Sequence, residues 1–253
     1  MTSFAPTPAW QDEFNQPAGT GPDPAKWIHD LGDSGWGNKE LQVYTDSREN
    51  SFVAADPEAT GGRALVLKAV RTPGGGYTSA RLKTHGKFAT GYGRIEARLR
   101  LPRGQGIWPA FWMLGANIDE VPWPACGEID IVELVGHQPG TLHGTLHGPG
   151  YSAQHGLLKS TELPGGAHFG EAYHVFAVDW RPGRIDWRLD GRIYHTRTPA
   201  DLPPGTKWAF DHQTCFLLLN LAVGGIWPGY PDDTTVFPQE LRIDYVRVYP
   251  LRS

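Results

Sequence analysis

Apolar and charged side chains alternate without interruption along residues 93–101 (Gly-Arg-Ile-Glu-Ala-Arg-Leu-Arg-Leu). Successive side chains of a β-strand point to opposite faces of a sheet, so this pattern predicts a strand with one buried side and one solvent-facing side. Residues 185–189 alternate in the same way up to Asp190-Gly191, and Ile193 follows. A two-residue Asp-Gly connection is typical of a β-hairpin, because glycine tolerates a positive φ.

Further strands are expected at residues 64–70, 173–180, 216–223 and 241–249, and no segment shows a convincing 3.6-residue period with helix caps. The 253 residues include 32 Gly and 22 Pro, without a short repeat, as expected for a chain with many turns. Short strands separated by such turns predict an all-β fold of two antiparallel sheets packed face to face. Such folds commonly exceed about 200 residues as one domain, so residues 1–253 are expected to form a single domain.

Charge and hydropathy exclude several classes of protein. The net charge is −4 and no run of Lys or Arg occurs, which argues against a nucleic-acid partner. No apolar stretch approaches the roughly 18 residues of a membrane-spanning helix, and the first residues lack the charged start and apolar run of a signal peptide. Cys126 and Cys215 leave two possibilities open, one disulfide or two separate buried thiols.

Three carboxylates occur within one apolar strand candidate, Glu128-Ile-Asp-Ile-Val-Glu133. Glu128 and Asp130 share a face, whereas a regular strand would point Glu133 the opposite way. One extra residue in a β-bulge near residues 131–132 would return Glu133 to the acidic side. Crowded carboxyls push their pKa values apart, so one stays protonated while another is ionised. Glycoside hydrolysis with retention needs such a pair roughly 5–5.5 Å apart; a solvated strand face or a cation site is the alternative.

The segment Gly127–Glu133 resembles the active-site signature of glycoside hydrolase family 16, in its Glu-x-Asp-x-x-Glu form with the extra bulge residue. Within that family the sequence is most similar to bacterial endo-β-1,3-glucanases (laminarinases). The resemblance implies a β-jelly-roll sandwich with the acids in a concave substrate cleft, and a core of about residues 12–249. Other matching segments follow in the family's order, at residues 38–42, 106–114, 143–149, 220–225 and 243–249.

The resemblance also implies roles by matching position. Glu128 is expected to be the nucleophile, Glu133 the general acid/base, and Asp130 the residue that tunes and hydrogen-bonds the nucleophile. The implied reaction is endo-hydrolysis of β-1,3-glucosidic linkages in laminarin-type glucans by double displacement, which needs no cofactor.

Strand parity divides the ten tryptophans into packing and binding candidates. Trp108 and Trp112 share parity, opposite to Ile107 and Phe111, so both indoles are expected on a sugar-binding face. Trp123 and Trp227 lie in segments rich in Pro and Gly and are expected at the rim of the cleft. The remaining expectation is that three tryptophans pack in the core: Trp180, Trp187 and Trp208.

His143 and His147 share a face but lack the three or four ligands of a zinc site, and the plain interpretation is one hydrogen-bonded structural histidine. The resemblance places His147 beside the catalytic acids, in contact with substrate. It also places Asn38 and Arg81 at positions that hydrogen-bond sugar hydroxyls.

A structural Ca²⁺ remote from catalysis is implied by similar family members. The matching positions are Glu13 and Gly62, through main-chain oxygens, and Asp244. A hard cation takes six to eight oxygen ligands, so water would have to complete the shell.

Several functional alternatives stay open at this level. A mixed-linkage β-1,3/1,4-glucanase or another polysaccharide specificity would differ in loop contacts, and a transglycosylase would share every residue named. A non-catalytic β-glucan-binding lectin could use the same sandwich and aromatics, but a pure binder has no use for three crowded carboxylates. A polysaccharide substrate predicts an extracellular, secreted protein whose signal peptide is absent from this sequence, and a monomer that binds neither nucleic acid nor membrane.

Overall fold

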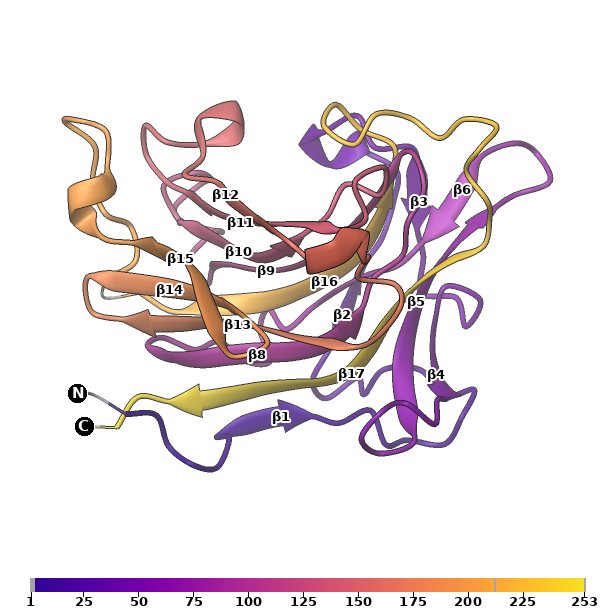
Figure 1. The fold of residues 1–253 in the computed structure, drawn as a ribbon, viewed down its shortest axis with the longest axis horizontal. Coiled ribbons are helices and arrows are strands. Elements are labelled where there is room, and N and C mark those ends of the chain that lie inside the picture. Colours follow the sequence, from indigo (N-terminus) through magenta and orange to yellow (C-terminus); the bar gives the residue numbers. More distant parts are fainter. Residues whose placement is uncertain (1–2, 212, 253) are drawn as a thin grey trace.

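The computed structural model describes residues 3–211 and 213–252, and almost all regular elements among these residues are strands (Figure 1). Short 3₁₀ turns account for the rest: η1 (Gly35–Gly37), η2 (Ala153–His155), η3 (Pro164–Gly166) and η4 (Pro199–Asp201). In chain order the strands are β1 (Trp10–Asp12), β2 (Ile28–Asp30), β3 (Gln42–Tyr44), β4 (Ser51–Ala55), β5 (Arg63–Arg71), β6 (Tyr77–Ser79), β7 (Arg81–Lys83), β8 (Gly93–Arg100), β9 (Ile107–Gly115), β10 (Glu128–Glu133), β11 (Thr141–His147), β12 (Lys159–Glu162), β13 (His174–Arg181), β14 (Arg184–Leu189), β15 (Arg192–Arg197), β16 (Cys215–Val223) and β17 (Gln239–Pro250).

The strands form two sheets, as the all-β prediction requires. One sheet of ten strands runs β15-β14-β13-β8-β17-β5-β6-β3, with β1 added to β17 and β4 added to β5. The second, of seven strands, runs β12-β11-β10-β9-β16-β7-β2. Neighbouring strands pair antiparallel, except that β3 and β6 pair in parallel.

Alternation along the strands builds the core between the two sheets. On β8 the side chains of Ile95, Ala97 and Leu99 are fully buried, while those of Glu96 and Arg98 between them are half-buried on the opposite face. From the other sheet, Ile129 and Ile131 of β10 join the same buried cluster. The seven-stranded sheet therefore has one face on this core and a second face turned away from it.

The long strands and the hairpin agree with the sequence predictions. Residues 190–191 connect β14 to β15, and both have positive φ (48° for Asp190 and 79° for Gly191), as this tight turn requires. Trp180 and Trp187 are completely buried, and Trp208 packs against the core as a half-buried side chain. The three tryptophans predicted to pack in the core do so.

The sequence did not reveal the short elements at the sheet edges. β1, β2, β3, β6 and β7 have three residues each, too few to display a periodic pattern. Both cysteines are free and buried, which settles the alternatives in favour of two thiols. No helix in the described part of the chain is long and apolar enough to cross a membrane.

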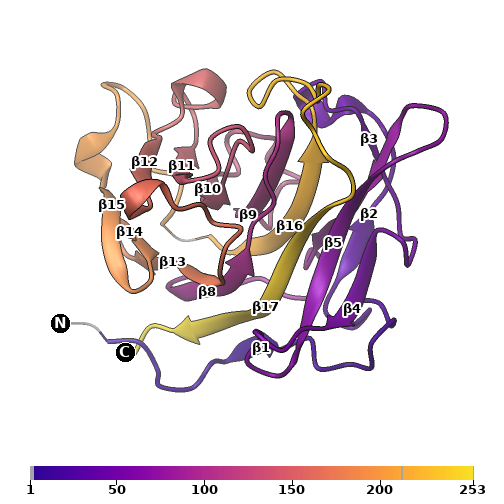
Figure 2. The ribbon, with the colours of Figure 1, turned by 45° about the vertical axis from the view of Figure 1, so that its right-hand side comes forward.

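Two loops far apart in the sequence meet beyond the seven-stranded sheet. Figures 1 and 2 show the loop with η1 beside the loop that follows β16. The Ile226 N–H donates to the Asn38 carbonyl over 2.9 Å, which joins the two loops. Both loops carry residues that the sequence proposes for sugar binding, Asn38 in the first and Trp227 in the second.

Candidate active site

β10 carries all three acidic residues, and its register shifts within the acidic segment. On the β11 side Asp130 pairs with Thr145 and Glu133 with His143, so three steps along β10 match two along β11. The same shift appears against β9, between Asp130 and Val132. This is the predicted β-bulge, and it turns Glu133 to the face that Glu128 and Asp130 occupy. We call this surface of the seven-stranded sheet the acidic face.

Glu128 begins the strand directly after a glycine that the local backbone requires. Gly127 has φ +76°, and a Cβ there would lie 2.6 Å from the Gln213 amide nitrogen, so a larger residue would be both strained and obstructed. The Trp123 indole N–H donates to Glu128 Oε2 over 2.7 Å. Glu128 therefore starts β10 with a fixed neutral donor on one carboxylate oxygen.

Asp130 and Glu133 are buried and are held by residues of β11. His147 Nε2 lies 3.2 Å from Asp130 Oδ2, and the Thr145 hydroxyl donates to Glu133 Oε2 over 3.3 Å. From the core side, the Trp187 indole N–H donates to the Asp130 main-chain carbonyl over 2.7 Å. The bulged segment is thus fixed from both sides of the sheet.

Burial and mutual repulsion raise the pKa values of all three carboxyls. Burial, followed by the charge of Asp130, raises the pKa of Glu128 to about 8. Burial also raises the pKa of Glu133 to about 7 and raises that of Asp130 well above its usual range. A cluster of this kind cannot ionise all its members at neutral pH and retains protons that its members share.

The groups around the three carboxyls determine which of them is ionised. Taken alone, its raised pKa would leave Glu128 protonated at pH 7. The hydrogen bond from Trp123 and the charge of His147 oppose this rise by favouring the Glu128 anion, whereas hydrogen bonding between the two carboxyls raises the pKa of Glu128 and lowers that of Asp130. The two carboxyls therefore share a proton, and Glu128 is the anion when that proton rests on Asp130, while the raised pKa of Glu133 lets it keep a proton of its own near neutral pH. The arrangement supplies one nucleophilic carboxylate and one carboxylic acid on the same face.

On the β16 and β7 side of the acids, aromatic rings clamp a guanidinium group. Arg81 lies between Trp36, 4.6 Å from the ring centroid, and Trp112, at 4.9 Å, and its Nε is 3.0 Å from Asp30 Oδ2. The predicted residues Arg81 and Trp112 are therefore in contact. Trp36 completes this stack, although the sequence analysis did not single it out.

A chain of hydrogen bonds fixes Trp112 from behind. The Trp112 indole N–H donates to Asn220 Oδ1 over 2.7 Å, Asn220 donates to the Tyr44 hydroxyl over 3.3 Å, and that hydroxyl donates to Glu40 Oε2 over 3.3 Å. The Asn38 amide donates to Glu40 Oε1 over 3.1 Å. Because the Asn38 N–H₂ group is engaged in this way, its amide oxygen is left to accept from a ligand.

On the Glu133 side, two indoles and a histidine pack together. Trp108 and Trp227 meet edge to face with ring centroids 5.6 Å apart, and His143 lies 5.0 Å from Trp227. Trp108 lies close enough to Glu133 to lower its pKa, although its buried indole nitrogen has no hydrogen-bond partner among the described residues. The predicted parity of Trp108 and Trp112 is confirmed, since both are half-buried while their neighbours on β9 are buried.

The predicted rim residues are exposed. Trp123 exposes 43% and Trp227 38% of its surface, which leaves aromatic surface available for stacking on a sugar ring. Trp123 also lies 6.2 Å from His147, centroid to centroid. Among the described residues, one group of three brings possible metal-ligand atoms within 4.8 Å of one another: Glu128, Asp130 and His147.

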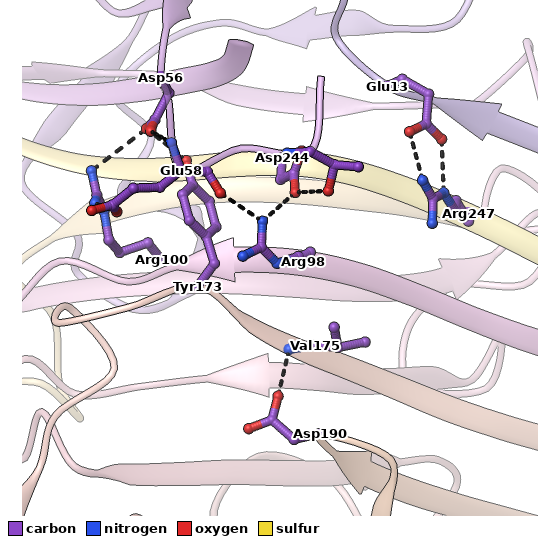
Figure 3. A network of polar contacts seen from close by, with 11 residues as sticks. Glu13, Asp56, Glu58, Arg98, Arg100, Tyr173, Val175, Asp190, Asp244 and Arg247 are labelled. Carbon is purple, nitrogen blue, oxygen red and sulfur yellow. Dashed lines mark hydrogen bonds and ion pairs between the residues drawn. The ribbon is translucent and has the colours of Figure 1, made fainter. Parts of the chain in front are cut away.

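At two of the positions proposed for calcium, Glu13 and Asp244, the side chains contact arginines (Figure 3). Both oxygens of Glu13 accept from Arg247, over 2.8 and 2.7 Å. Asp244 accepts from the main chain and hydroxyl of Thr60 and forms an ion pair with Arg98, and the Gly62 carbonyl accepts from the Asp56 N–H over 3.0 Å. The Asp244 carboxylate, the one side-chain ligand expected, is thus held by Thr60 and Arg98, whereas the Glu13–Arg247 pair leaves the expected main-chain oxygen of Glu13 untested.

Four contributors to the site were missing from the sequence analysis: Trp36, Glu40, Tyr44 and Asn220. Glu40, Gln42 and Tyr44 are spaced two residues apart, so the sequence does contain an alternating set of polar side chains here. β3 is three residues long, and nothing local indicated that it would lie beside β16.

Comparisons with known proteins agree with this geometry. The family model of glycosyl hydrolases family 16 matches residues 36–247. The beta-glucanase of Rhodothermus marinus is 43% identical over 254 residues, covering 95% of this chain and 84% of the relative. The catalytic domain of an endo-1,3-beta-glucanase (laminarinase) from Thermotoga petrophila superposes with a TM-score of 0.88 at 44% identity, covering 100% of both chains. The endo-beta-1,3-glucanase of Pyrococcus furiosus superposes with a TM-score of 0.87 at 44% identity, covering 97% of this chain and 95% of the other. The family model, the relatives and the bulged acidic strand agree, and this chain belongs to glycoside hydrolase family 16.

Proposed function

We propose that this glycoside hydrolase is an endo-β-1,3-glucanase that cleaves laminarin-type glucans with retention of anomeric configuration. The observation that carries the proposal is the bulge in β10, which brings three carboxyls to one face and buries two of them almost completely. The endo-1,3-β-glucanase relatives of high identity support the same linkage. Two carboxyl groups suffice for the chemistry, so no cofactor takes part.

Hydrolysis proceeds in two displacements. Glu128 attacks the anomeric carbon, the glycosidic C–O bond breaks, and Glu133 gives its proton to the departing oxygen. The resulting glycosyl ester on Glu128 is then attacked by a water molecule that gives a proton to Glu133, and the ester bond breaks to free Glu128. Asp130 carries a proton that hydrogen-bonds to Glu128. Neither displacement consumes this proton, so the site is back in its starting state after the second step.

The aromatic and polar residues around the acids bind the glucan chain. Trp112, Arg81 and the free amide oxygen of Asn38 offer binding surface towards β7, and Trp108 and Trp227 offer indole surface near the Glu133 end of β10. Trp123 donates to Glu128, and His147 contacts Asp130 and lies near Glu128. Because this surface extends beyond the acids in two directions, cleavage within a chain rather than at its end is expected.

A non-catalytic glucan-binding protein is the main alternative of another class. Burying Asp130 and Glu133 side by side is costly, and binding of a neutral polysaccharide gains nothing from it. A mixed-linkage β-1,3/1,4 specificity and a transglycosylase retain the same acids and are separated by assay.

The remaining parts of the proposal concern the setting of the enzyme. We propose a single catalytic domain that works as a monomer outside the cell, where a polymeric glucan is accessible. Calcium stays a prediction, and the ion pair between Asp244 and Arg98 weighs against the one side-chain ligand that it names.

A side-by-side reducing-end assay on laminarin, lichenan and agarose tests the proposal, with Glu128→Gln as the matched inactive control. We expect hydrolysis of laminarin by the wild type and its loss in the variant. Activity on agarose alone would contradict the glucanase assignment while leaving the family intact, and near-normal activity in folded Glu128→Gln and Glu133→Gln variants would contradict the catalytic roles.

A further inference from the structure

His143 occupies a position on the acidic face that the proposed mechanism does not use. It lies on β11 directly opposite Glu133 in the strand register and points to the same face as Thr145, which donates to Glu133. Its side chain is 7% exposed. The sequence favoured one hydrogen-bonded structural histidine in the pair His143 and His147, and one of the two ring nitrogens of His143 fits that expectation.

The two ring nitrogens of His143 differ in their surroundings. Nδ1 lies 2.8 Å from the hydroxyl of Ser160, which is paired with His143 on the neighbouring strand β12. Nε2 is buried and has no hydrogen-bond partner among the described residues. An unpaired buried nitrogen lowers the stability of the fold by about 1–3 kcal/mol. We expect a protein to keep such a nitrogen beside its acid/base residue when the bound substrate supplies the missing hydrogen-bond partner.

The chemistry of the position selects a neutral ligand. Burial lowers the pKa of His143 to about 4, so the imidazole is uncharged at neutral pH. Ser160 can either donate to Nδ1 or accept from it, which leaves Nε2 as a donor or an acceptor respectively. A sugar hydroxyl satisfies both cases because it donates and accepts. The exposed indole of Trp227, 5.0 Å from the imidazole, adds an apolar surface of the kind that stacks on a pyranose ring.

We infer that His143 Nε2 binds a hydroxyl of the glucan and, with Trp227, forms a glucosyl-binding subsite on the Glu133 side of the acids. The inference rests on the proposed function, because it takes the ligand to be a glucan chain lying across the acidic face. It assigns His143 to substrate binding and leaves the bond-breaking steps to the carboxyls.

His195 provides a matched control. It is also buried, its pKa is lowered to about 4, and its Nε2 also lacks a partner among the described residues. It differs in place, since it lies on β15 of the ten-stranded sheet and packs on the core residue Trp187 at 4.4 Å. If an unpaired histidine nitrogen is merely tolerated in this fold, the two residues will behave alike.

The test measures binding of laminari-oligosaccharides of increasing length by calorimetry, in a Glu128→Gln background that binds without turnover. His143→Phe keeps a planar ring against Trp227 and removes the polar nitrogens. We expect about tenfold weaker binding of oligosaccharides long enough to reach the subsite, as for one lost hydrogen bond. Shorter oligosaccharides should bind unchanged, and the thermal midpoint should stay close to that of the parent, since removal of the unpaired Nε2 offsets the lost contact between Nδ1 and Ser160. His195→Phe should leave binding unaltered at every length.

Two results would overturn the inference. One is unchanged affinity of folded His143→Phe for every oligosaccharide, and the other is an equal loss in His195→Phe. Absence of any laminari-oligosaccharide binding in the Glu128→Gln protein with His143 intact would instead contradict the proposed function, and the subsite with it.

Discussion

At the scale of single residues, the carboxyls of the acidic face lower the stability of the folded protein. Asp130 and Glu133 are almost fully buried beside Glu128, and each raises the pKa of a neighbour. A group whose pKa is higher in the folded than in the unfolded state destabilises the fold when it ionises. The acids that give the site its chemistry therefore weaken the folded protein as pH rises.

Glu133→Gln is expected to raise the thermal midpoint at pH 8 and to leave it unchanged at pH 4. The pKa of Glu133 rises from 4.5 to about 7 on folding, so the folded state binds more protons between these pH values and stability falls as pH rises through them. Below about 4.5 the cost is absent, and above about 7 it is complete. A gain of several degrees is expected, because ~1 kcal/mol shifts the midpoint of a chain of this size by about 2–4 °C.

Scanning calorimetry at the two pH values measures this difference. Glu162→Gln, on the exposed side of β12, removes a carboxylate outside the cluster and should give no pH-dependent gain. A Glu133→Gln midpoint at pH 8 equal to or below that of the wild type would contradict the account of the buried acids.

Single residues also show where reading the sequence works and where it stops. Trp108 and Trp112 could be assigned to the binding face because strand parity alone decides which way a side chain points. Glu40 and Asn220 could not, since their role comes from a hydrogen-bond chain that joins β3 to β16 across 176 residues. Only the folded arrangement makes that contact.

At the scale of elements, the bulge in β10 is what unites the acids. Three residues of β10 span the distance of two on β11, so removing one residue from the bulge should restore a regular strand. In a regular strand the spacing of the acids becomes two and two, and all three still share a face.

Deletion of Val132 is therefore expected to give a folded protein that retains measurable laminarin hydrolysis. Loss of one fully buried side chain should lower its stability by about 1–4 kcal/mol, so the assay belongs well below the wild-type midpoint. Insertion of one alanine after Ile131 is the matched control, because it extends the bulge and misplaces Glu133. An inactive, folded deletion variant together with an active insertion variant would show that the bulge does not set the direction of Glu133.

Elements differ in how well the sequence predicts them. β8, β14, β16 and β17 are long enough for alternation or an apolar run to be visible, and the predicted segments agree with them. The edge strands of three residues show no pattern, and their pairing depends on the sheets already being in place. The bulge itself was predictable because the odd spacing of Glu133 conflicted with the chemistry that the acids imply.

At the scale of the whole molecule, the outer face of the ten-stranded sheet is held together by internal ion pairs. Arg98 bridges Asp244 and the main chain of Glu58, and Arg100 lies 3.6 Å from Asp56. Arg247 pairs with Glu13 through two hydrogen bonds. These contacts tie the N-terminal segment and the loop after β4 to β8 and β17 (Figure 3).

The thermal midpoint of the wild type is expected to be unchanged by a chelator, because arginines already neutralise these carboxylates. Arg98→Met should lower the midpoint by roughly 5–10 °C, since it leaves buried Asp244 without its cation. Arg63→Met, which removes a donor to the Asn15 carbonyl, serves as the control and should have a smaller effect. A midpoint that falls with chelator and recovers on addition of calcium would favour the calcium site over the arginine network.

The two-sheet architecture was predictable as a whole from strand alternation and turn composition, because burying one face of each strand leaves few other arrangements. The sequence did not reveal that β15, β14 and β13 continue the sheet that contains β17, or that the loop after β16 meets the loop with η1. Such neighbours are separated by long stretches of chain, and their contacts are decided by tertiary packing rather than by local preference.

Azide rescue of two variants tests the assignment of nucleophile and acid/base most directly. In Glu128→Ala, azide can fill the space of the missing nucleophile and attack from the face that Glu128 occupied, so the product is an α-glycosyl azide. In Glu133→Ala, azide attacks the glycosyl ester on Glu128 from the opposite face and gives a β-glycosyl azide. Product configuration is read by NMR with an activated laminari-oligosaccharide. We predict the α product from Glu128→Ala and the β product from Glu133→Ala, and the reverse pairing would contradict the proposed mechanism.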